Sequence, residues 1–340
     1  MATELEILID RYEALGIDQQ VDYDKFYLYS IITHSTAIEG STITELENQI
    51  MFDQGISLKG KSLEEQMMNL DLKVAYEKSI AWARLHTDFT VELLTELSAL
   101  VMKNTGKEYK TALGDFSSAK GELRLLNVTA GVGGRSYMNY SKVPTKLNEF
   151  CVELNEVRAN SLALSIQQLY EFSFDAHYKL VTIHPWADGN GRMARLVMNH
   201  LQFEFGLVPT KILNEDKEDY IKALVATRES EDLSIFRVFM TGLMTRNLRL
   251  DIDVFRNSME EDVVRSREKN IKGGEKTLKS REKIISLLLE DPMLSATTVA
   301  TRIGISSKAV EKHFARLKAD GILRRIGPDK GGRWEVIIKN

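Results

Sequence analysis

The sequence has a single cysteine among 340 residues and no long apolar run. One thiol cannot form an internal disulfide or supply a multi-cysteine zinc site, so we expect Cys151 to be an ordinary buried residue of a helix. No apolar segment approaches the roughly 18 residues that span a bilayer. The first residues, MATELEILIDRYEAL, are acidic and amphipathic, whereas a signal peptide is basic and then apolar. These absences predict a cytoplasmic protein without a membrane partner.

Internal repeats and low-complexity tracts are also missing. Hydrophobic residues make up 43% of the chain and charged residues 28%, the balance of an ordinary globular protein, which excludes disordered and collagen-like classes. The length predicts two domains, with room for a third small one.

The net charge of −4 hides an asymmetry along the chain. Residues 265–340 carry 18 Lys and Arg against 9 Asp and Glu, whereas residues 1–264 carry 27 against 40. A small basic terminal domain is typical of nucleic-acid binding. The alternative is that the basic tail docks on the acidic body.

Hydrophobic periodicity indicates a mainly α-helical protein. Apolar residues recur at three- and four-residue spacing through most of residues 1–256, as in a helical bundle. A glycine-rich stretch at 114–140 interrupts this pattern with the β-capable piece LRLLNV before Gly131 to Gly134, which predicts a hairpin or flap; a plain connector is the alternative. We therefore expect an N-terminal helical region, a core with the flap, a linker and a basic domain, at 1–110, 111–256, 257–280 and 281–340.

The segment after Ser280 has the pattern of a winged helix. Ser295 and Ser306 can each cap a helix, with a turn at Gly304 between them, and the remaining residues alternate toward a hairpin around Gly327 to Gly332. This order is helix-turn-helix plus wing. The second helix leaves basic side chains free for phosphates, namely Lys308, Lys312, Arg316 and Lys318. DNA binding is one use of this unit, and protein contact or dimerisation is the other.

The segment VTIHPWADGNGRMARLVMN, residues 181–199, indicates a phosphate site between two helices. Pro185 disfavours helix at the residue before it, which leaves His184 at the edge of a loop. Gly189 and Gly191 let backbone amides approach a ligand, and the N-terminus of a helix starting near Asn190 favours an anion.

Three charged residues of the same segment extend the phosphate site. Arg192 and Arg195 are three apart, so they share a helix face that can hold more phosphate. Asp188 can bridge a hard cation such as Mg²⁺ to phosphate oxygens. Taken singly, His184 also fits a structural histidine, Asp188 an ordinary turn, and the two arginines solvated side chains. Together they predict a nucleotide-phosphate pocket beside a histidine.

The segment matches H-P-[FW]-x-D-G-N-G-R-x-x-R, the signature of the Fic family of nucleotidyl transferases, with Trp186 where that family mostly has Phe. The resemblance extends over about residues 20–250. It implies a Fic-type helical bundle with a short β-hairpin flap, followed here by the winged helix-turn-helix unit.

The resemblance also implies a mechanism. His184 would be the general base that takes a proton from a Ser, Thr or Tyr hydroxyl of a target protein, which then attacks the α-phosphorus of ATP. Asp188 would hold Mg²⁺. The implied ATP-binding residues are Ala187, Gly189, Asn190, Gly191, Arg192, Arg195 and Tyr220. For Tyr220 a buried position in the bundle is the alternative.

A second, upstream match is HSTAIEGSTIT at residues 34–44, which fits [ST]-x-x-x-E-[GN], the inhibitory-helix motif of the family. Ser35 and Glu39 share one helix face and Gly40 ends the helix. The resemblance implies that Glu39 pairs with Arg195 and keeps ATP in an unproductive pose. A bundle helix with a surface glutamate is the alternative.

The predicted function is therefore a protein adenylyltransferase that uses ATP and Mg²⁺ and is inhibited by Glu39. One alternative is that the same site also removes AMP, and another is a transcriptional regulator that senses nucleotide. The resemblance implies that a target segment docks at the flap, around Leu126, Val128 and Tyr137, by main-chain pairing. The sequence leaves the target protein, any DNA site and a homodimer open.

Overall fold

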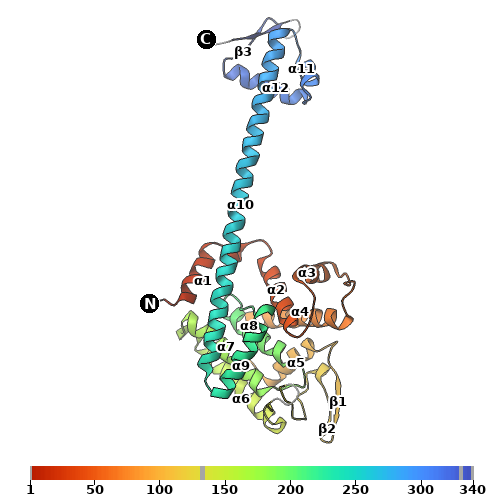
Figure 1. The fold of residues 1–340 in the computed structure, drawn as a ribbon, viewed down its shortest axis with the longest axis vertical. Helices are drawn as coiled ribbons and strands as arrows, with labels where there is room; N and C mark the ends of the chain where they lie inside the picture. Colours follow the sequence, from red (N-terminus) through yellow and green to blue (C-terminus); the bar gives the residue numbers. More distant parts are fainter. Residues whose placement is uncertain (1, 131–134, 329–331, 338–340) are drawn as a thin grey trace. The chain divides into compact units, whose positions relative to one another are not determined.

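A computed structural model describes residues 2–130, 135–328 and 332–337, without the side chains of 259–279. The chain divides into two compact units, Met1–Val254 and Phe255–Asn340 (Figure 1). Each unit has its own cluster of buried hydrophobic side chains.

The first unit consists mostly of α-helices (Figure 1), which confirms the predicted mainly helical fold. In chain order the helices are α1 (Glu4–Ala14), α2 (Tyr23–Ile38), α3 (Glu45–Gln54), α4 (Leu63–Arg84), α5 (Val91–Val101), α6 (Val143–Ala159), α7 (Ile166–Ile183), α8 (Asn190–Glu204) and α9 (Lys217–Ser230). Helix α10 (Leu233–Glu290) starts in the first unit and continues into the second. None of the described helices is long and apolar enough to cross a membrane.

Capping boxes set the start of four of these helices. In α1, α3, α4 and α7 a Ser or Thr side chain accepts the backbone N–H three residues on, and the Glu or Gln there accepts the N–H of the capping residue. The capping residues are Thr3, Thr44, Ser62 and Ser165. Short sequence patterns therefore fix these helix starts.

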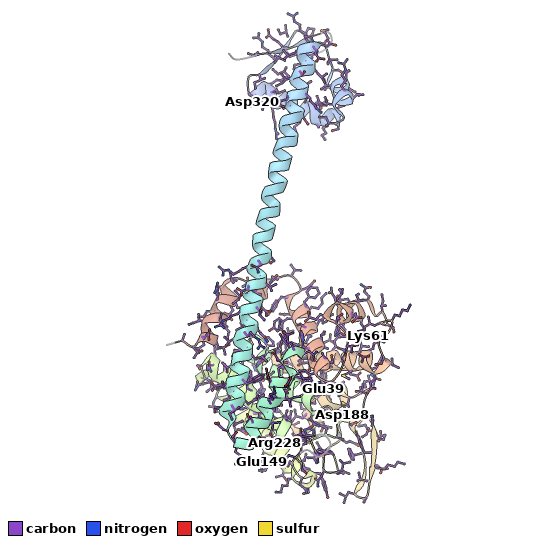
Figure 2. The ribbon with its side chains drawn as sticks, in the orientation of Figure 1. Glu39, Lys61, Glu149, Asp188, Arg228 and Asp320 are labelled. Carbon is purple, nitrogen blue, oxygen red and sulfur yellow. The ribbon has the colours of Figure 1, made fainter. Side chains whose placement is uncertain are left out.

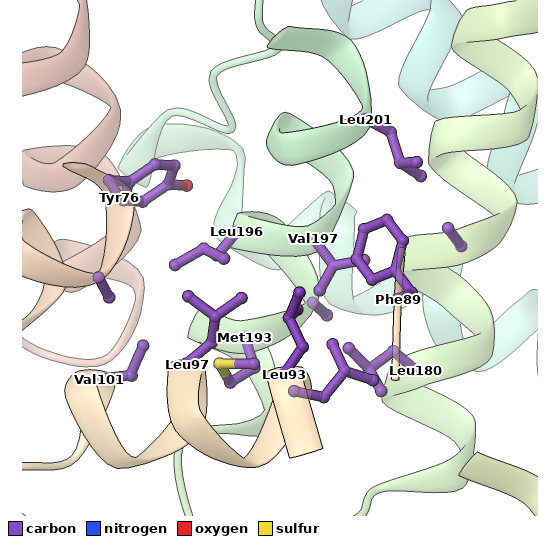
Figure 3. Packing of buried hydrophobic residues seen from close by; sticks show 14 of the residues in the cluster. Tyr76, Phe89, Leu93, Leu97, Val101, Leu180, Met193, Leu196, Val197 and Leu201 are labelled. Atoms are coloured by element: carbon purple, nitrogen blue, oxygen red, sulfur yellow. The ribbon is translucent and has the colours of Figure 1, made fainter. Parts of the chain in front are cut away.

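Helix α8 lies at the centre of the first unit, packed against α7, α4 and α5. Met193, Leu196 and Val197 of α8 are fully buried and meet Leu97 and Val101 of α5 in the core (Figure 3). Deep burial on several sides holds α8 rigidly, because packed interiors tolerate little displacement. The loop before α8, where the phosphate motif lies, is thus attached to a deeply buried helix.

The β-structure of the first unit differs from the expectation. Strands β1 (Glu108–Thr111) and β2 (Gly114–Ser117) form an antiparallel hairpin that periodicity did not reveal. The piece 123–128 forms no strand, because Arg124 N donates to Pro185 O (3.1 Å) and its guanidinium is buried against other carbonyls. Pairing begins at the end of this piece, where Val128 O accepts from Tyr137 N (3.0 Å) and Thr129 and Ser136 form an antiparallel bridge. We call residues 123–130 and 135–139 the flap; the expected turn at 131–134 lies outside the described residues.

The second unit is a winged helix-turn-helix, as predicted. Helices α11 (Ala296–Ile303) and α12 (Ser307–Ala319) are followed by the antiparallel strands β3 (Leu323–Ile326) and β4 (Arg333–Val336). Ser295 and Ser306 cap the two helices through their hydroxyls. The segment 257–280 has helical backbone as part of α10.

Candidate active site

His184 lies where α7 ends. Its backbone is left-handed, with φ 53°, and its N–H donates to Leu180 O (3.0 Å), so it caps the helix just before Pro185. The ring nitrogen Nδ1 is 3.2 Å from Val181 O, which makes Nδ1 the donor and leaves the lone pair on Nε2. The imidazole is therefore oriented with its basic nitrogen away from the helix.

The electrostatic surroundings keep this imidazole neutral. Burial lowers the pKa of His184 to about 4, and the nearby Arg124 guanidinium acts in the same direction, while the Val181 carbonyl and Asp188 oppose it. At neutral pH the side chain is consequently unprotonated and able to accept a proton.

Two side chains fix the shape of the loop between α7 and α8. Asn190 Nδ2 donates to Trp186 O (2.9 Å) and its Oδ1 accepts from Trp186 N (3.1 Å). The Trp186 ring is fully buried, and its Nε1 donates to Gly121 O (2.9 Å). Asn190 thus closes the loop through its side chain, and Ala187 lies half-buried within it.

Close neighbours crowd both glycines of the motif, Gly189 before α8 and Gly191 in its first turn. A Cβ at Gly189, where φ is +80°, would lie 2.7 Å from Met102 Sδ. A Cβ at Gly191 would lie 2.7 Å from Glu39 Oε1. Helix α8 begins at Asn190 with no capping side chain among the described residues. Its first N–H groups, which have no intrahelical partners, therefore form an anion-binding end.

Arg192 has donors to spare beside this helix end. Its side chain is almost fully buried, with Nη2 3.1 Å from Met102 Sδ and 3.7 Å from Asp188 Oδ1. Its Nε and Nη1 have no hydrogen-bond partner among the described residues. Burial lowers the pKa of Arg192, and the charges of Glu39 and Asp188 oppose that shift. A buried guanidinium with unused donors is suited to a phosphate ligand.

Asp188 is the one acidic side chain of the loop, and about half of it is exposed. Its Oδ1 accepts from Gly189 N (2.6 Å). In the described part of the chain, no group of three or more His, Cys, Asp or Glu residues could hold a metal ion. A single exposed carboxylate fits Mg²⁺, which takes its remaining ligands from phosphates and water.

The upstream motif reaches the same site through Arg195, which is 3% exposed. Arg195 Nε donates to Ser35 Oγ (2.8 Å), and Nη2 donates to Ser35 O (3.0 Å) and Glu39 Oε1 (2.6 Å). Helix α2 ends at Ile38, and Gly40 turns the chain with φ +106°. Figure 2 labels Glu39, which follows α2, and Asp188, which lies in the loop before α8.

Both members of the Glu39–Arg195 pair are held in their charged forms. Burial alone would raise the pKa of the Glu39 carboxyl, but Arg195, aided by Arg192, outweighs burial and lowers it. Burial would lower the pKa of Arg195, but the Glu39 charge outweighs it and raises that pKa. The carboxylate therefore occupies the space above Gly191 as an anion, at the place where the helix end favours one.

Tyr220 is placed differently from the other predicted residues. It is 3% exposed, its hydroxyl lies 2.9 Å from His177 Nε2, and its ring packs near Phe236. Burial raises the pKa of Tyr220 to about 12, and Arg195 opposes that shift. Tyr220 is thus part of the packed layer behind Arg195, and its contact with a nucleotide stays a prediction.

Sequence patterns did not indicate the role of Arg124. Its side chain is 1% exposed, and it donates Nε to His184 O (2.7 Å), Nη1 to Leu126 O (2.7 Å) and Nη2 to Met138 O. One guanidinium thus connects both sides of the flap to the loop between α7 and α8. The only sequence signal is an arginine within an apolar stretch, which is rarely buried unless its donors are used.

A cleft next to His184 was also missed. It has a volume of about 360 Å³ and lies between the flap, α7 and α9, with Tyr137, Tyr178, Ile221, Leu224 and Arg228 among its lining residues. Tyr137 stacks on the His184 ring, with ring centres 3.7 Å apart and planes 14° apart. We call this the lateral cleft. It is mostly apolar, as ligand pockets usually are.

Comparison with known proteins shows which families this arrangement resembles. The model of the Fic/DOC family matches residues 88–202, which include the loop and α8 up to Gln202. Residues 88–202 are thus similar to a Fic/DOC domain. A second model, winged helix-turn-helix DNA-binding, matches residues 278–324. The predicted family resemblance is confirmed in both regions.

The curated proteins that the chain resembles include several from insects. The chain is 29% identical over 222 residues to a protein of Drosophila grimshawi named protein adenylyltransferase Fic, covering 64% of this chain and 42% of that protein. The chain thus spans about two fifths of the length of the curated relatives it matches.

Solved structures share the fold. A Fic domain-containing signaling protein from Bacteroides thetaiotaomicron is 21% identical with a TM-score of 0.62, covering 75% of this chain and 97% of that one. A Fic family protein from Desulfovibrio desulfuricans is 19% identical with a TM-score of 0.57, covering 99% of this chain and 94% of that one.

Proposed function

We propose that the protein transfers AMP from ATP to a Ser, Thr or Tyr hydroxyl of a target protein. The observation that carries this proposal is the imidazole of His184, whose Nδ1 lies against Val181 O and leaves Nε2 available, beside an uncapped helix N-terminus and the unused donors of Arg192. Attack on a phosphorus atom needs a base for the attacking hydroxyl and an anion site for the phosphate oxygens. Both lie within one short segment here. The name of the insect relatives supports the same activity.

The chemistry follows from the placement of each group. His184 Nε2 takes the proton of the target hydroxyl as its oxygen attacks the α-phosphorus, and the bond from that phosphorus to pyrophosphate breaks. The N-terminal amides of α8 and the guanidinium of Arg192 stabilise the charge that develops on the phosphate oxygens. Mg²⁺ held by Asp188 would neutralise part of the charge on the leaving group.

The lateral cleft is the place we assign to the nucleotide base. It is apolar, large enough for a purine and adjacent to His184 through Tyr137. The target segment would then pair with the outer side of the flap, whose two sides bridge at Thr129 and Ser136. With the nucleotide base on one side of the flap and the target segment on the other, the α-phosphate and the target hydroxyl would meet at His184.

Glu39 would act as a built-in inhibitor of this reaction. Its carboxylate uses an Arg195 donor and lies over Gly191, so it competes with a phosphate for the same end of α8. ATP would still bind, but with its triphosphate displaced from the productive position.

The direct test is label transfer from ATP carrying ³²P at the α-phosphate, with purified protein and cell extract. We expect His184→Ala to lower transfer by roughly 10² to 10⁴, because it removes the general base. The matched control is His86→Ala, since the His86 side chain is 71% exposed and lies outside the loop. Transfer at the wild-type rate by the His184→Ala protein would refute the mechanism.

A second function, DNA binding, is favoured by the match of residues 278–324 to a DNA-binding winged helix. Exposed basic side chains of α12, including Lys312 and Arg316, can contact phosphates. We propose that residues 281–340 tether the Fic-like region to DNA, or respond to whether that region holds a nucleotide, with 257–280 as the connection. A homodimer bound through this unit is compatible with such a role.

A further inference from the structure

Among the described residues that line the lateral cleft, one side chain is charged, the guanidinium of Arg228 from α9. The guanidinium carbon lies 5.6 Å from the centre of the Tyr137 ring, which itself covers His184. Arg228 Nε is buried and has no hydrogen-bond partner among the described residues. A buried donor without a partner is costly, so this one is expected to meet an acceptor on a ligand.

The other described lining residues carry no charge. They include no carboxylate and no carboxamide; their hydroxyls, on Tyr137, Tyr178 and Thr182, can accept a hydrogen bond as well as donate one, and that of Thr182 donates to Tyr178 O (2.9 Å). Arginine presents only donors, arranged as a planar fork. The polar chemistry of the described lining therefore favours a ligand edge that carries acceptors side by side.

Purine bases differ at this edge. Guanine presents two adjacent acceptors, O6 and N7, which an arginine can bind together, whereas adenine presents the acceptor N7 beside the N6 amino donor. A guanidinium can bind adenine at N7 alone, with its second donor facing the amino group. A carboxamide, by contrast, matches adenine at both positions.

We propose that Arg228 enables the site to use GTP as a second nucleotide donor, through a paired contact with O6 and N7 of guanine. The inference rests on the proposed function, because it places the base in the lateral cleft. The transfer step is the same as with ATP. The target oxygen bonds to the α-phosphorus of GTP as pyrophosphate leaves, His184 takes the hydroxyl proton, and GMP stays on the target.

The test compares ATP and GTP by two independent measurements. Label transfer from each nucleotide, labelled at the α-phosphate, is followed in a Glu39→Gly background. Binding of each unlabelled nucleotide is measured by calorimetry with the His184→Ala protein, in which transfer is expected to be roughly 10² to 10⁴ slower. Arg228→Gln is the informative variant, because a carboxamide matches adenine and mismatches guanine. Lys222→Gln is the control, since Lys222 lies on the same helix, is largely exposed and pairs with Glu218.

We expect GTP to bind and to be used within about tenfold of ATP, and Arg228→Gln to lower the ratio of GTP to ATP affinity by roughly tenfold or more. Lys222→Gln should leave that ratio unchanged. Absence of GTP binding to the parent protein, or an unchanged ratio in Arg228→Gln with native circular dichroism, overturns the inference. Absence of label from either nucleotide while the binding ratio shifts would refute the transfer reaction and leave the base preference standing.

Discussion

Removing the carboxylate of Glu39 should increase activity, although most changes near an active site decrease it. In Glu39→Gly the guanidinium of Arg195 keeps its two bonds to Ser35 and loses only the 2.6 Å bond to Glu39. The arginine therefore stays in place with a free donor, and the space above Gly191 becomes open to a phosphate.

The expected gain follows from the single bond that is lost. A hydrogen bond to a charged group contributes about 1.5 to 3 kcal/mol. One third of the Glu39 side chain is exposed, so water screens part of the interaction and the lower end of this range applies. At about 1.4 kcal/mol per factor of ten, autolabelling should rise roughly tenfold.

The assay is autolabelling from ATP labelled at the α-phosphate, with initial rates measured at fixed protein concentration. Glu231→Gly is a suitable control, because Glu231 is exposed and has φ 55°, a conformation that glycine adopts without strain. The double variant Glu39→Gly with Arg195→Ala should lose the gain. The inhibitory role of Glu39 is wrong if Glu39→Gly labels no faster than wild type. A gain that persists without Arg195 would show that Glu39 acts through another contact.

Three further predictions test the site, its support and the second unit. Because the pKa of His184 is lowered to about 4, the rate of Glu39→Gly should stay level from pH 8 to pH 5, and a half-maximal rate near pH 6.5 would contradict this. Trp186→Phe removes the donor to Gly121 O and should lower the free energy of unfolding, measured with urea, by about 1 to 3 kcal/mol. An unchanged unfolding midpoint would show that this hydrogen bond does not stabilise the fold. Lys312→Ala and Arg316→Ala should each reduce the salt dependence of DNA binding, measured by anisotropy, by about one counterion, and full-length protein that binds no DNA at low salt would exclude this role.

Local patterns explain which parts of the fold could be predicted. The winged helix was recognisable because Ser295, Ser306 and Gly304 act on backbone groups only a few residues away. The candidate site between α7 and α8 was recognisable for the same reason, since residues 184–195 lie within one loop and the start of one helix. Interactions within such short distances along the chain depend little on the remaining structure.

The lateral cleft and the flap could not be predicted in this way. Arg124 contacts the carbonyl of His184, and Tyr137 stacks on the same residue, although both precede it by a whole helical hairpin. The β1–β2 hairpin was missed because its strands have four residues each, too short for a clear alternation. Arg228 carried no signal in the sequence, since its place in the cleft depends on how α9 packs.

The position of Glu39 depends on a buried network that the inhibitory motif does not include. Asn69 of α4 is fully buried; its Oδ1 accepts from Thr36 Oγ1 (2.8 Å) and Asn48 Nδ2 (2.9 Å), and its Nδ2 donates to Ser41 Oγ (3.1 Å).

These bonds hold the chain on both sides of Glu39, joining α2, α3 and α4 in one layer. Buried polar networks of this kind are costly to break in part, because each lost partner leaves an unsatisfied group. On this interpretation the carboxylate cannot leave Arg195 by a shift of the end of α2 alone. If Glu39 inhibits as proposed, relief requires either that a phosphate displaces the side chain, or that the three helices move together.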